Sequence, residues 1–378
     1  MRLRPILASP LLCLGLSLAC GGGGSSSPAP TGNLALRFGS DSLPGLSQAV
    51  VGLEKVEASP DGATWTALGN VKATFDLMTL QNGHSALVLP ATTVRAATYT
   101  QFRITWATVN YRSIIDQPAY AVTSSGAERL LTMPVTTVIS GSVTVPANGG
   151  ATAQIILSGQ QAVQARSATA ATFFATGRAF DLAASASIAG RLADGATPLA
   201  GVEVFAETVD GLGIATLQRR AVTDASGNYL LEGLPTGGLY FVAAQPASAT
   251  SAYAAAASAP VNATSATTYT ANLSFSNPQT PGALALSITP VSTATQGTWG
   301  ELRQALATGG AGSQNLIVRS QTATAEASPE QATFLGLAPG IYGVTAQRST
   351  SGAAPAMKTG AQVLVSAGAT ATTTLSFP

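Results

Sequence analysis

Histidine, cysteine and charge are scarce in this chain. Its 378 residues include one His and two Cys, and charged residues make up 9%, against about 25% in an average domain. A zinc site built from several Cys and His side chains is therefore excluded. Eighteen basic and seventeen acidic residues leave a net charge of +1, whereas nucleic-acid binders carry a basic stripe. We expect no metal, no other cofactor and no nucleic-acid partner.

Strand-forming residues dominate what is present. Short runs rich in Thr, Val and Ile are separated by Gly, Pro and Asn, at a spacing of about 8–12 residues that is typical of β-sandwiches. The sequence therefore predicts an all-β protein made of tandem antiparallel β-sandwiches of immunoglobulin or prealbumin type. One exception is residues 300–306, Gly-Glu-Leu-Arg-Gln-Ala-Leu, which we expect to form a short helix.

The N-terminus has the features of an export signal. Arg2 and Arg4 are followed by an apolar stretch at residues 6–19, which is shorter than the roughly 20 residues that span a bilayer. Cys20 comes next, and residues 21–30 are rich in Gly, Ser and Pro, the composition of a flexible tether. These features predict a chain that is exported and then held on a tether.

The segment Leu-Ser-Leu-Ala-Cys at residues 16–20 resembles the bacterial lipobox, whose Cys receives acyl chains such as palmitate. It departs from that pattern at Ser17, where the family usually has Leu. The resemblance implies a lipoprotein signal peptide at residues 1–19, then a lipidated Cys20 and tether at 20–32. It implies a lipid-anchored protein of the cell envelope, on the outer membrane if the host is a diderm bacterium. An ordinary secretory signal with an incidental Cys20 is the alternative.

The first long segment, residues 33–185, contains a series of strand-like motifs. The runs are Val-Val-Gly-Leu-Glu-Lys-Val-Glu-Ala, Phe-Asp-Leu-Met-Thr-Leu-Gln-Asn-Gly and Tyr-Thr-Gln-Phe-Arg-Ile. Their order resembles domain-of-unknown-function family 4382, which is common in secreted bacterial lipoproteins and has no established biochemical role. The resemblance implies a β-sandwich and a location, but no chemistry.

The second segment, residues 186–276, carries the motifs Thr-Asp-Ala-Ser-Gly-Asn-Tyr and Gly-Leu-Pro-Thr-Gly-Gly-Leu-Tyr. It resembles the carboxypeptidase regulatory-like module, a prealbumin-like sandwich that is the non-catalytic appendage of certain carboxypeptidases. The third segment, residues 281–378, repeats the second motif as Gly-Leu-Ala-Pro-Gly-Ile-Tyr. We interpret it as a degenerate second copy of the same sandwich.

The repeated motif has a structural explanation. A core Leu is followed by a Pro and Gly turn that needs a fixed φ and a positive φ, and then by a Tyr that packs inward with its hydroxyl at the rim. We therefore predict a folding motif rather than a binding site for Gly233, Leu234, Pro235, Tyr240, Gly336, Leu337, Pro339 and Tyr342.

Few residues are candidates for chemistry. A catalytic triad or dyad would need His84, which lies in a turn-like Asn-Gly-His-Ser sequence. Glu54 and Glu57 are three apart on a predicted strand and so face opposite sides. A Trp ring could stack on a sugar, and only Trp299, between two Gly residues, is expected to be exposed enough to contact a ligand. We assign no catalytic residue.

Three functions are compatible with these features. The first is a non-enzymatic, lipid-anchored envelope protein with a structural or binding role, whose partners are the membrane and an envelope protein or polysaccharide. The second is a carbohydrate-binding protein of the cell surface or periplasm, which exposed aromatic side chains would favour. The third and most remote is a hydrolase, which needs His84 or two converging carboxylates in a cleft.

Overall fold

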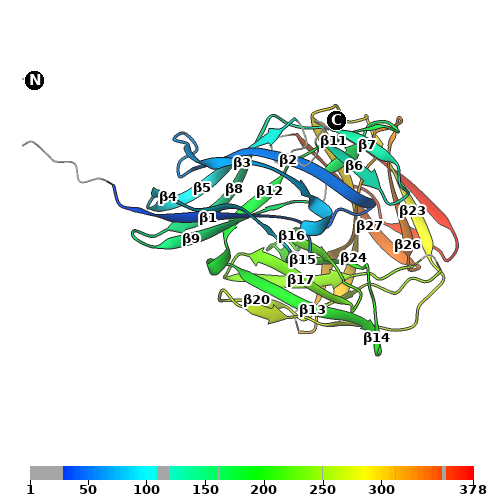
Figure 1. The fold of residues 1–378 in the computed structure, drawn as a ribbon. Helices are drawn as coiled ribbons and strands as arrows, with labels where there is room; N and C mark the ends of the chain where they lie inside the picture. Colours follow the sequence, from blue (N-terminus) through cyan, green and yellow to red (C-terminus); the bar gives the residue numbers. More distant parts are fainter. Residues whose placement is uncertain (1–28, 109–118, 160–161, 249, 311, 351–354) are drawn as a thin grey trace, which may run out of the picture.

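The computed structural model describes residues 29–108, 119–159, 162–248, 250–310, 312–350 and 355–378. Within these residues the chain consists of β-strands, with two short 3-10 turns, η1 (Leu77–Leu80) and η2 (Leu182–Ala184). In the ranges just given, no helix is long and apolar enough to cross a membrane. The predicted all-β class is confirmed, and the strands fall into three units, visible in Figure 1.

The first unit is a single, strongly curved assembly of twelve strands. Strand β8 joins its two halves, because it pairs with β5 on one side and with β12 on the other. Most pairs are antiparallel, but β1 with β9, β8 with β12 and β7 with β11 are parallel. The strands are β1 (Thr31–Ser40), β2 (Leu46–Ser59), β3 (Thr66–Asp76), β4 (Ala86–Arg95), β5 (Ala97–Ala107), β6 (Tyr120–Thr123), β7 (Glu128–Thr132), β8 (Thr136–Val145), β9 (Gly150–Leu157), β10 (Val163–Ala165), β11 (Ala170–Phe173) and β12 (Gly177–Asp181).

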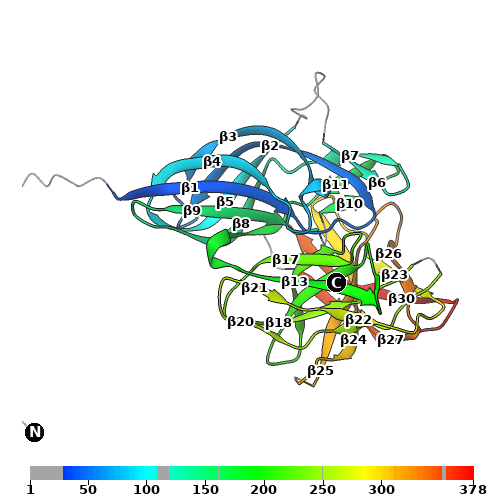
Figure 2. The same ribbon diagram turned by 60° about the horizontal axis from the view of Figure 1, so that its bottom comes forward.

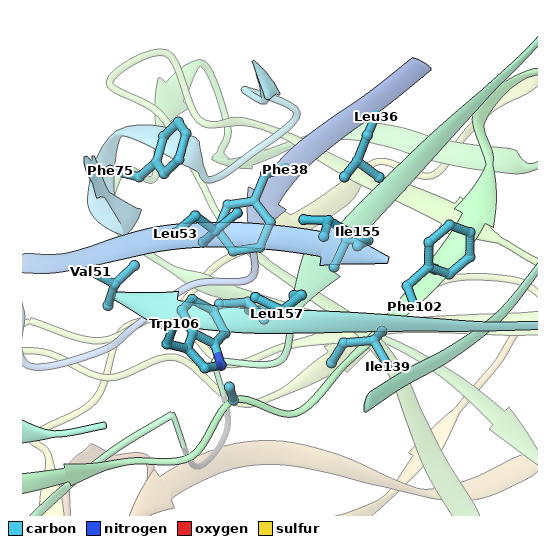
Figure 3. Packing of buried hydrophobic residues seen from close by; sticks show 14 of the residues in the cluster. Leu36, Phe38, Val51, Leu53, Phe75, Phe102, Trp106, Ile139, Ile155 and Leu157 are labelled. Carbon is cyan, nitrogen blue, oxygen red and sulfur yellow. The ribbon is translucent and has the colours of Figure 1, made fainter. Parts of the chain in front are cut away.

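An aromatic cluster fills the core of the first unit, which Figure 3 shows from close by. Trp106 lies edge-on to both Phe38 and Phe173, with ring centroids 6.2 and 5.3 Å apart. The indole N–H of Trp106 donates to the hydroxyl of Thr137 at 2.9 Å. A buried indole needs such a partner, so Trp106, which is 4% exposed, is a core residue.

The second unit consists of two sheets. Its strands are β13 (Ala186–Asp194), β14 (Thr197–Pro198), β15 (Glu203–Val209), β16 (Ala215–Val222), β17 (Asn228–Leu234), β18 (Gly238–Ala244), β19 (Ala256–Ala257), β20 (Val261–Ala263), β21 (Thr268–Thr270) and β22 (Leu273–Phe275). One sheet gathers β14, β13 and β17 with β21 and β22, and the other has the order β16-β15-β18-β19 with β20 beside β18.

The third unit repeats this plan with eight strands instead of ten. Its strands are β23 (Gly282–Thr289), β24 (Gln296–Ala307), β25 (Ser313–Thr322), β26 (Glu330–Leu337), β27 (Gly340–Thr350), β28 (Ala356–Thr359), β29 (Val363–Val365) and β30 (Thr370–Ser376). In both units the first strand pairs antiparallel with the strand that carries the repeated Gly-Leu, and parallel with the final strand. The sequence Leu-Ser-Phe occurs in or at the end of both final strands, at residues 273–275 and 375–377. The shared pairing explains why this sequence and the Gly-Leu motif recur.

The short helix expected at residues 300–306 is wrong, because this segment is the middle of strand β24. It pairs on one side with β25 and on the other with β27. Leu, Gln and Ala favour a helix in isolation. A strand with hydrogen-bonded neighbours on both sides and buried side chains overrides that weak preference.

The three units pack against one another rather than forming an extended array, as Figures 1 and 2 show from two directions. The apolar core of the third unit continues into the second through Ala215, Phe241 and Ala243. Between the first and second units, Asn82 accepts the backbone N–H of Leu230 at 2.8 Å. We call the boundaries between units the seams.

The motif residue Gly233 lies at the seam between the first and second units. Its φ is +68°, and a Cβ built on it would lie 2.2 Å from the ring of Phe180 in β12. Gly237, in the turn that follows, also has a positive φ, +82°, but a Cβ there meets nothing within 4 Å. Substitutions of these two glycines therefore distinguish the cost of backbone strain from the cost of a steric clash across the seam.

Replacing either glycine by Ala tests this contact. We expect Gly237→Ala to cost about 1–2 kcal/mol of stability, because of left-handed backbone strain alone. Gly233→Ala should cost a further 1–3 kcal/mol or so, because its methyl group collides with Phe180. Urea unfolding of the full chain measures both, and equal losses would contradict the packing described for this seam.

Candidate functional site

The seams are lined by arginine side chains that cross from one unit to another. Between the first and third units, Arg129 pairs with Glu326 at 2.8 Å, and Arg166 donates to the carbonyl of Gln296 at 2.6 Å. Between the second and third, Arg303 donates to the carbonyl of Ala215 at 2.9 Å. A guanidinium group supplies up to five N–H donors, so it can satisfy carbonyls that two packed sheets would otherwise leave without partners.

The seam between the first and second units contains a polar pocket of about 290 Å³. Strand β12 contributes Arg178, strand β16 contributes Gln218 and Arg219, and Asp41 follows strand β1. The hydroxyl-bearing residues Ser158 and Thr176 also line this pocket. We call it the Arg178 pocket.

The charged groups of the Arg178 pocket do not all have an ion-pair partner. Arg219 forms an ion pair with Asp41 at 2.9 Å, and both side chains are 7% exposed. Arg178 donates to the carbonyl of Gly233 and, at 3.5 Å, to the amide oxygen of Gln218. Among the described residues no carboxylate lies within ion-pair distance of Arg178. The pocket therefore holds two guanidinium groups and one carboxylate.

Burial governs the titration of these groups. Burial raises the pKa of Asp41, although Arg219, Arg220 and Arg178 oppose that rise by favouring the charged carboxylate. Burial lowers the pKa of Arg178, and the neighbouring charge of Arg219 lowers it further. Both directions indicate that the pocket lies in a poorly solvated environment with positive charge in excess.

The seam between the second and third units buries an acid without a cationic partner. One oxygen of Glu207 accepts the backbone N–H of Ile317 at 2.9 Å, and the other has no hydrogen-bond partner. Burial raises the pKa of Glu207 well above 4.5; the N–H of Ile317 and the charge of Arg303 oppose the rise, and Glu301 adds to it. This carboxyl group is a structural element of the seam.

Four other hollows border the third unit, and two of them, of about 480 and 110 Å³, have a single charged side chain each. The largest, about 600 Å³, is lined mainly by small residues around Arg319, whose pKa is lowered by burial. Another, about 270 Å³, is mostly apolar and includes Met133, Phe173 and Phe174. Each presents fewer charged groups than the Arg178 pocket.

Most sequence-based candidates do not come together. Cys20 lies outside the described residues. The side chain of His84 is exposed, in a turn where the backbone N–H of this residue donates to the carbonyl of Gln81 at 3.0 Å. Glu57 is paired with Lys55 and Arg103, at 2.8 and 2.7 Å. In the segments that the structure describes, no group of three or more His, Cys, Asp or Glu side chains could hold a metal ion.

The expected exposure of Trp299 is wrong. Its side chain is 3% exposed, and its indole N–H donates to Glu301 at 3.1 Å. The flanking glycines belong to a central strand rather than a loop, so this ring offers no free face to a ligand. Trp65 is half-buried, and the guanidinium of Arg103 covers one face of its ring, 4.3 Å from the ring centroid.

The repeated motif has structural contacts in both copies. Leu234 and Leu337 are fully buried, and the hydroxyls of Tyr240 and Tyr342 each donate at 2.7 Å, to the carbonyls of Pro235 and Ala338. The tyrosine hydroxyls thus close the turns instead of lying at the rim.

In both copies the glycine before the Leu has a positive φ, +68° at Gly233 and +69° at Gly336. Pro339 and Gly340 form the shorter turn of the third unit, and Gly340 has no positive φ. The expected positive φ after the Pro therefore holds only for Gly237, the extra residue of the longer turn in the second unit.

Sequence reasoning missed the residues at the seams. Asp41 and Arg219, the most distant of them, are 178 positions apart, and no local pattern links them to Arg178. One signal was available: a chain with so few charges still places two arginines, Arg219 and Arg220, next to each other in a segment rich in strand-forming residues. In a strand, neighbouring side chains face opposite sides, so at least one of them needed a partner in a buried layer.

Comparison with known proteins supports part of these expectations. Residues 31–173 match the family described as "Domain of unknown function (DUF4382)", so the resemblance of the first segment is confirmed over that range. None of the curated proteins matches the chain.

Among solved structures, the Bacillus anthracis TIE protein is similar at 11% identity and a TM-score of 0.20, covering 92% of this chain and 50% of that one. The chain thus spans half the length of that protein. A streptococcal ancillary pilin has 11% identity, a TM-score of 0.22 and coverages of 91% and 98%. A minor pilin from Streptococcus agalactiae has 17% identity, a TM-score of 0.18 and coverages of 51% and 94%.

The buried carboxyl group of Glu207 is expected to make the stability of the fold depend on pH. Its folded-state pKa lies above the unfolded value, so its contribution to stability is complete below about pH 4.5 and is lost as pH rises through the folded pKa. Glu207→Gln removes the buried charge. We expect it to leave stability unchanged in acid and to raise it at neutral pH by about 1–3 kcal/mol.

Urea unfolding of the full chain across this pH range measures the effect. Glu128→Gln, at an exposed position of β7, is the matched control and should change little at any pH. A neutral-pH loss of stability in Glu207→Gln would show that the carboxylate is needed in its charged form.

Proposed function

We propose that this protein is a non-enzymatic, lipid-anchored component of the bacterial cell envelope, with a structural or binding role carried by its packed β-units. The observation that carries the proposal is the use of its scarce charged side chains. Glu57, Glu330 and Glu301 are each paired with an arginine, and Glu207 bonds to the backbone. In the part of the chain that the structure describes, these carboxyl groups therefore serve the packing of the β-units.

The anchor follows from the N-terminal sequence. Cys20 after a short apolar stretch, followed by a Gly/Ser/Pro tether, supports acylation and attachment to a membrane. Envelope proteins and polysaccharides are then the partners within reach, and the outer membrane is the site in a diderm host. Thr31, where the described body begins its first strand, lies shortly after this tether.

We further propose that the three units are domains with boundaries near residues 33–185, 186–276 and 281–378, the latter two being copies of a carboxypeptidase regulatory-like sandwich. The matching strand order of these two copies supports this division. The seams imply that the domains work as one body, since each shares hydrogen bonds with both others.

Aromatic recognition of sugars, on which the carbohydrate-binding alternative relied, has little support. Trp106 and Trp299 are buried, and Arg103 covers one face of the half-buried Trp65. The hydrolase alternative is weaker still, because His84 has no carboxylate or nucleophile hydrogen-bonded to it among the contacts of the described residues. A binding role through polar groups remains, and the Arg178 pocket is the place for it.

Expression in a diderm host with Cys20→Ala as the comparison tests the anchor. We expect the wild-type mature chain to begin at Cys20, to carry added acyl mass and to sediment with membranes. The variant should lack the acyl mass and stay in the soluble fraction. Intact-mass spectrometry and membrane fractionation measure both, and an unmodified, soluble wild-type chain would overturn the lipid anchor.

A further inference from the structure

We propose that the Arg178 pocket binds the carboxylate of a ligand about the size of one sugar ring, with a uronic acid as the best fit. This inference rests on the proposed binding role at the envelope and names the class of ligand. It uses a site that sequence motifs do not mark, at the seam between the first and second units.

The first argument is the unpaired cation. Arg178 is half-buried, and its guanidinium donates only to a carbonyl and a side-chain amide. The Nε of Arg219 is buried and has no hydrogen-bond partner. A poorly solvated cation without a carboxylate partner is unfavourable, so an anion in the pocket would stabilise this seam.

The second argument is the amount of charge. Arg178 and Arg219 line the pocket with Asp41, and the neighbouring Arg220 is paired with Glu203. These three positive charges and two negative ones leave an excess of one. A singly charged anion balances that excess, whereas sulfate or phosphate, which carry more charge, would exceed it. A carboxylate also matches the planar, two-donor geometry of guanidinium.

The third argument is the remaining lining. Ser158, Thr176 and Gln218 place hydroxyl and amide groups beside the two arginines, and Leu217 adds an apolar surface. The volume of about 290 Å³ is at the lower end of ligand pockets. Hydroxyl groups of a sugar acid could bond to these side chains while its carboxylate meets Arg178.

Calorimetric or NMR titration of the purified mature protein at low salt tests the proposal. The probes are glucuronate, glutamate, glucose and inorganic sulfate. We expect glucuronate to bind more tightly than glutamate, and glucose and sulfate to bind weakly or not at all. Added salt should weaken binding, because the contact is ionic. Stronger binding of sulfate or of glucose than of either carboxylate would overturn the assignment.

Two substitutions locate the site. Arg178→Gln removes the unpaired charge and should weaken glucuronate binding about 10- to 100-fold. The control is Arg191→Gln, at an exposed arginine whose guanidinium donates to the carbonyls of Ser226 and Ala196, and this variant should bind as the wild type does. Unchanged binding in Arg178→Gln, with the fold confirmed by circular dichroism, would overturn the proposal.

Asp41→Asn provides a second, opposite test. It removes the internal carboxylate that occupies Arg219 and raises the excess charge from one to two. We expect tighter carboxylate binding and the appearance of sulfate binding; weaker binding of both in a folded variant would contradict the charge argument. These titrations do not depend on the lipid anchor, so they can fail while membrane attachment holds, or succeed while it fails.

Discussion

The structure depends on hydrogen-bond partners for the backbone polar groups that are buried where the β-sheets of different units meet. Sheet edges and turns bring backbone carbonyls into the seams, and a buried carbonyl without a donor is costly. Arginines meet this need, as Arg178 does at Gly233, Arg303 at Ala215 and Arg166 at Gln296. A long side chain with several donors can cross a seam and still pack its methylene groups.

This use of arginine explains how a chain with so few charges remains a single body. Its charged side chains are used at buried positions, where pairs such as Arg219 with Asp41, at 2.9 Å across a seam, are nearly inaccessible to solvent. Such buried pairs contribute little net stability compared with apolar packing, but removing one partner leaves the other uncompensated. The seams therefore favour one arrangement of the units over others, which fixes the geometry of the pockets between them.

The strands and the repeated motif could be predicted because they are local. Alternation and turn residues mark each strand, and Gly233–Leu234 with Tyr240 recurs as a unit because each turn is closed by its own tyrosine. The seams could not be predicted, since Asp41 and Arg219 meet only after two units dock. Trp299 illustrates the same limit: its glycine neighbours suggested a loop, but Glu301 and two paired strands bury it.

Docking of the first and second units involves Arg178 and Arg219, the same residues that line the Arg178 pocket. The pocket exists only while Arg178 of the first unit faces Arg219 of the second. An anion that binds the docked form and not the separated one must stabilise docking, by an amount that grows with ligand concentration. Because two like charges face each other across this seam, the docked form without an anion carries a repulsion that a carboxylate relieves. Binding at this site is therefore linked to the rigidity of the whole body.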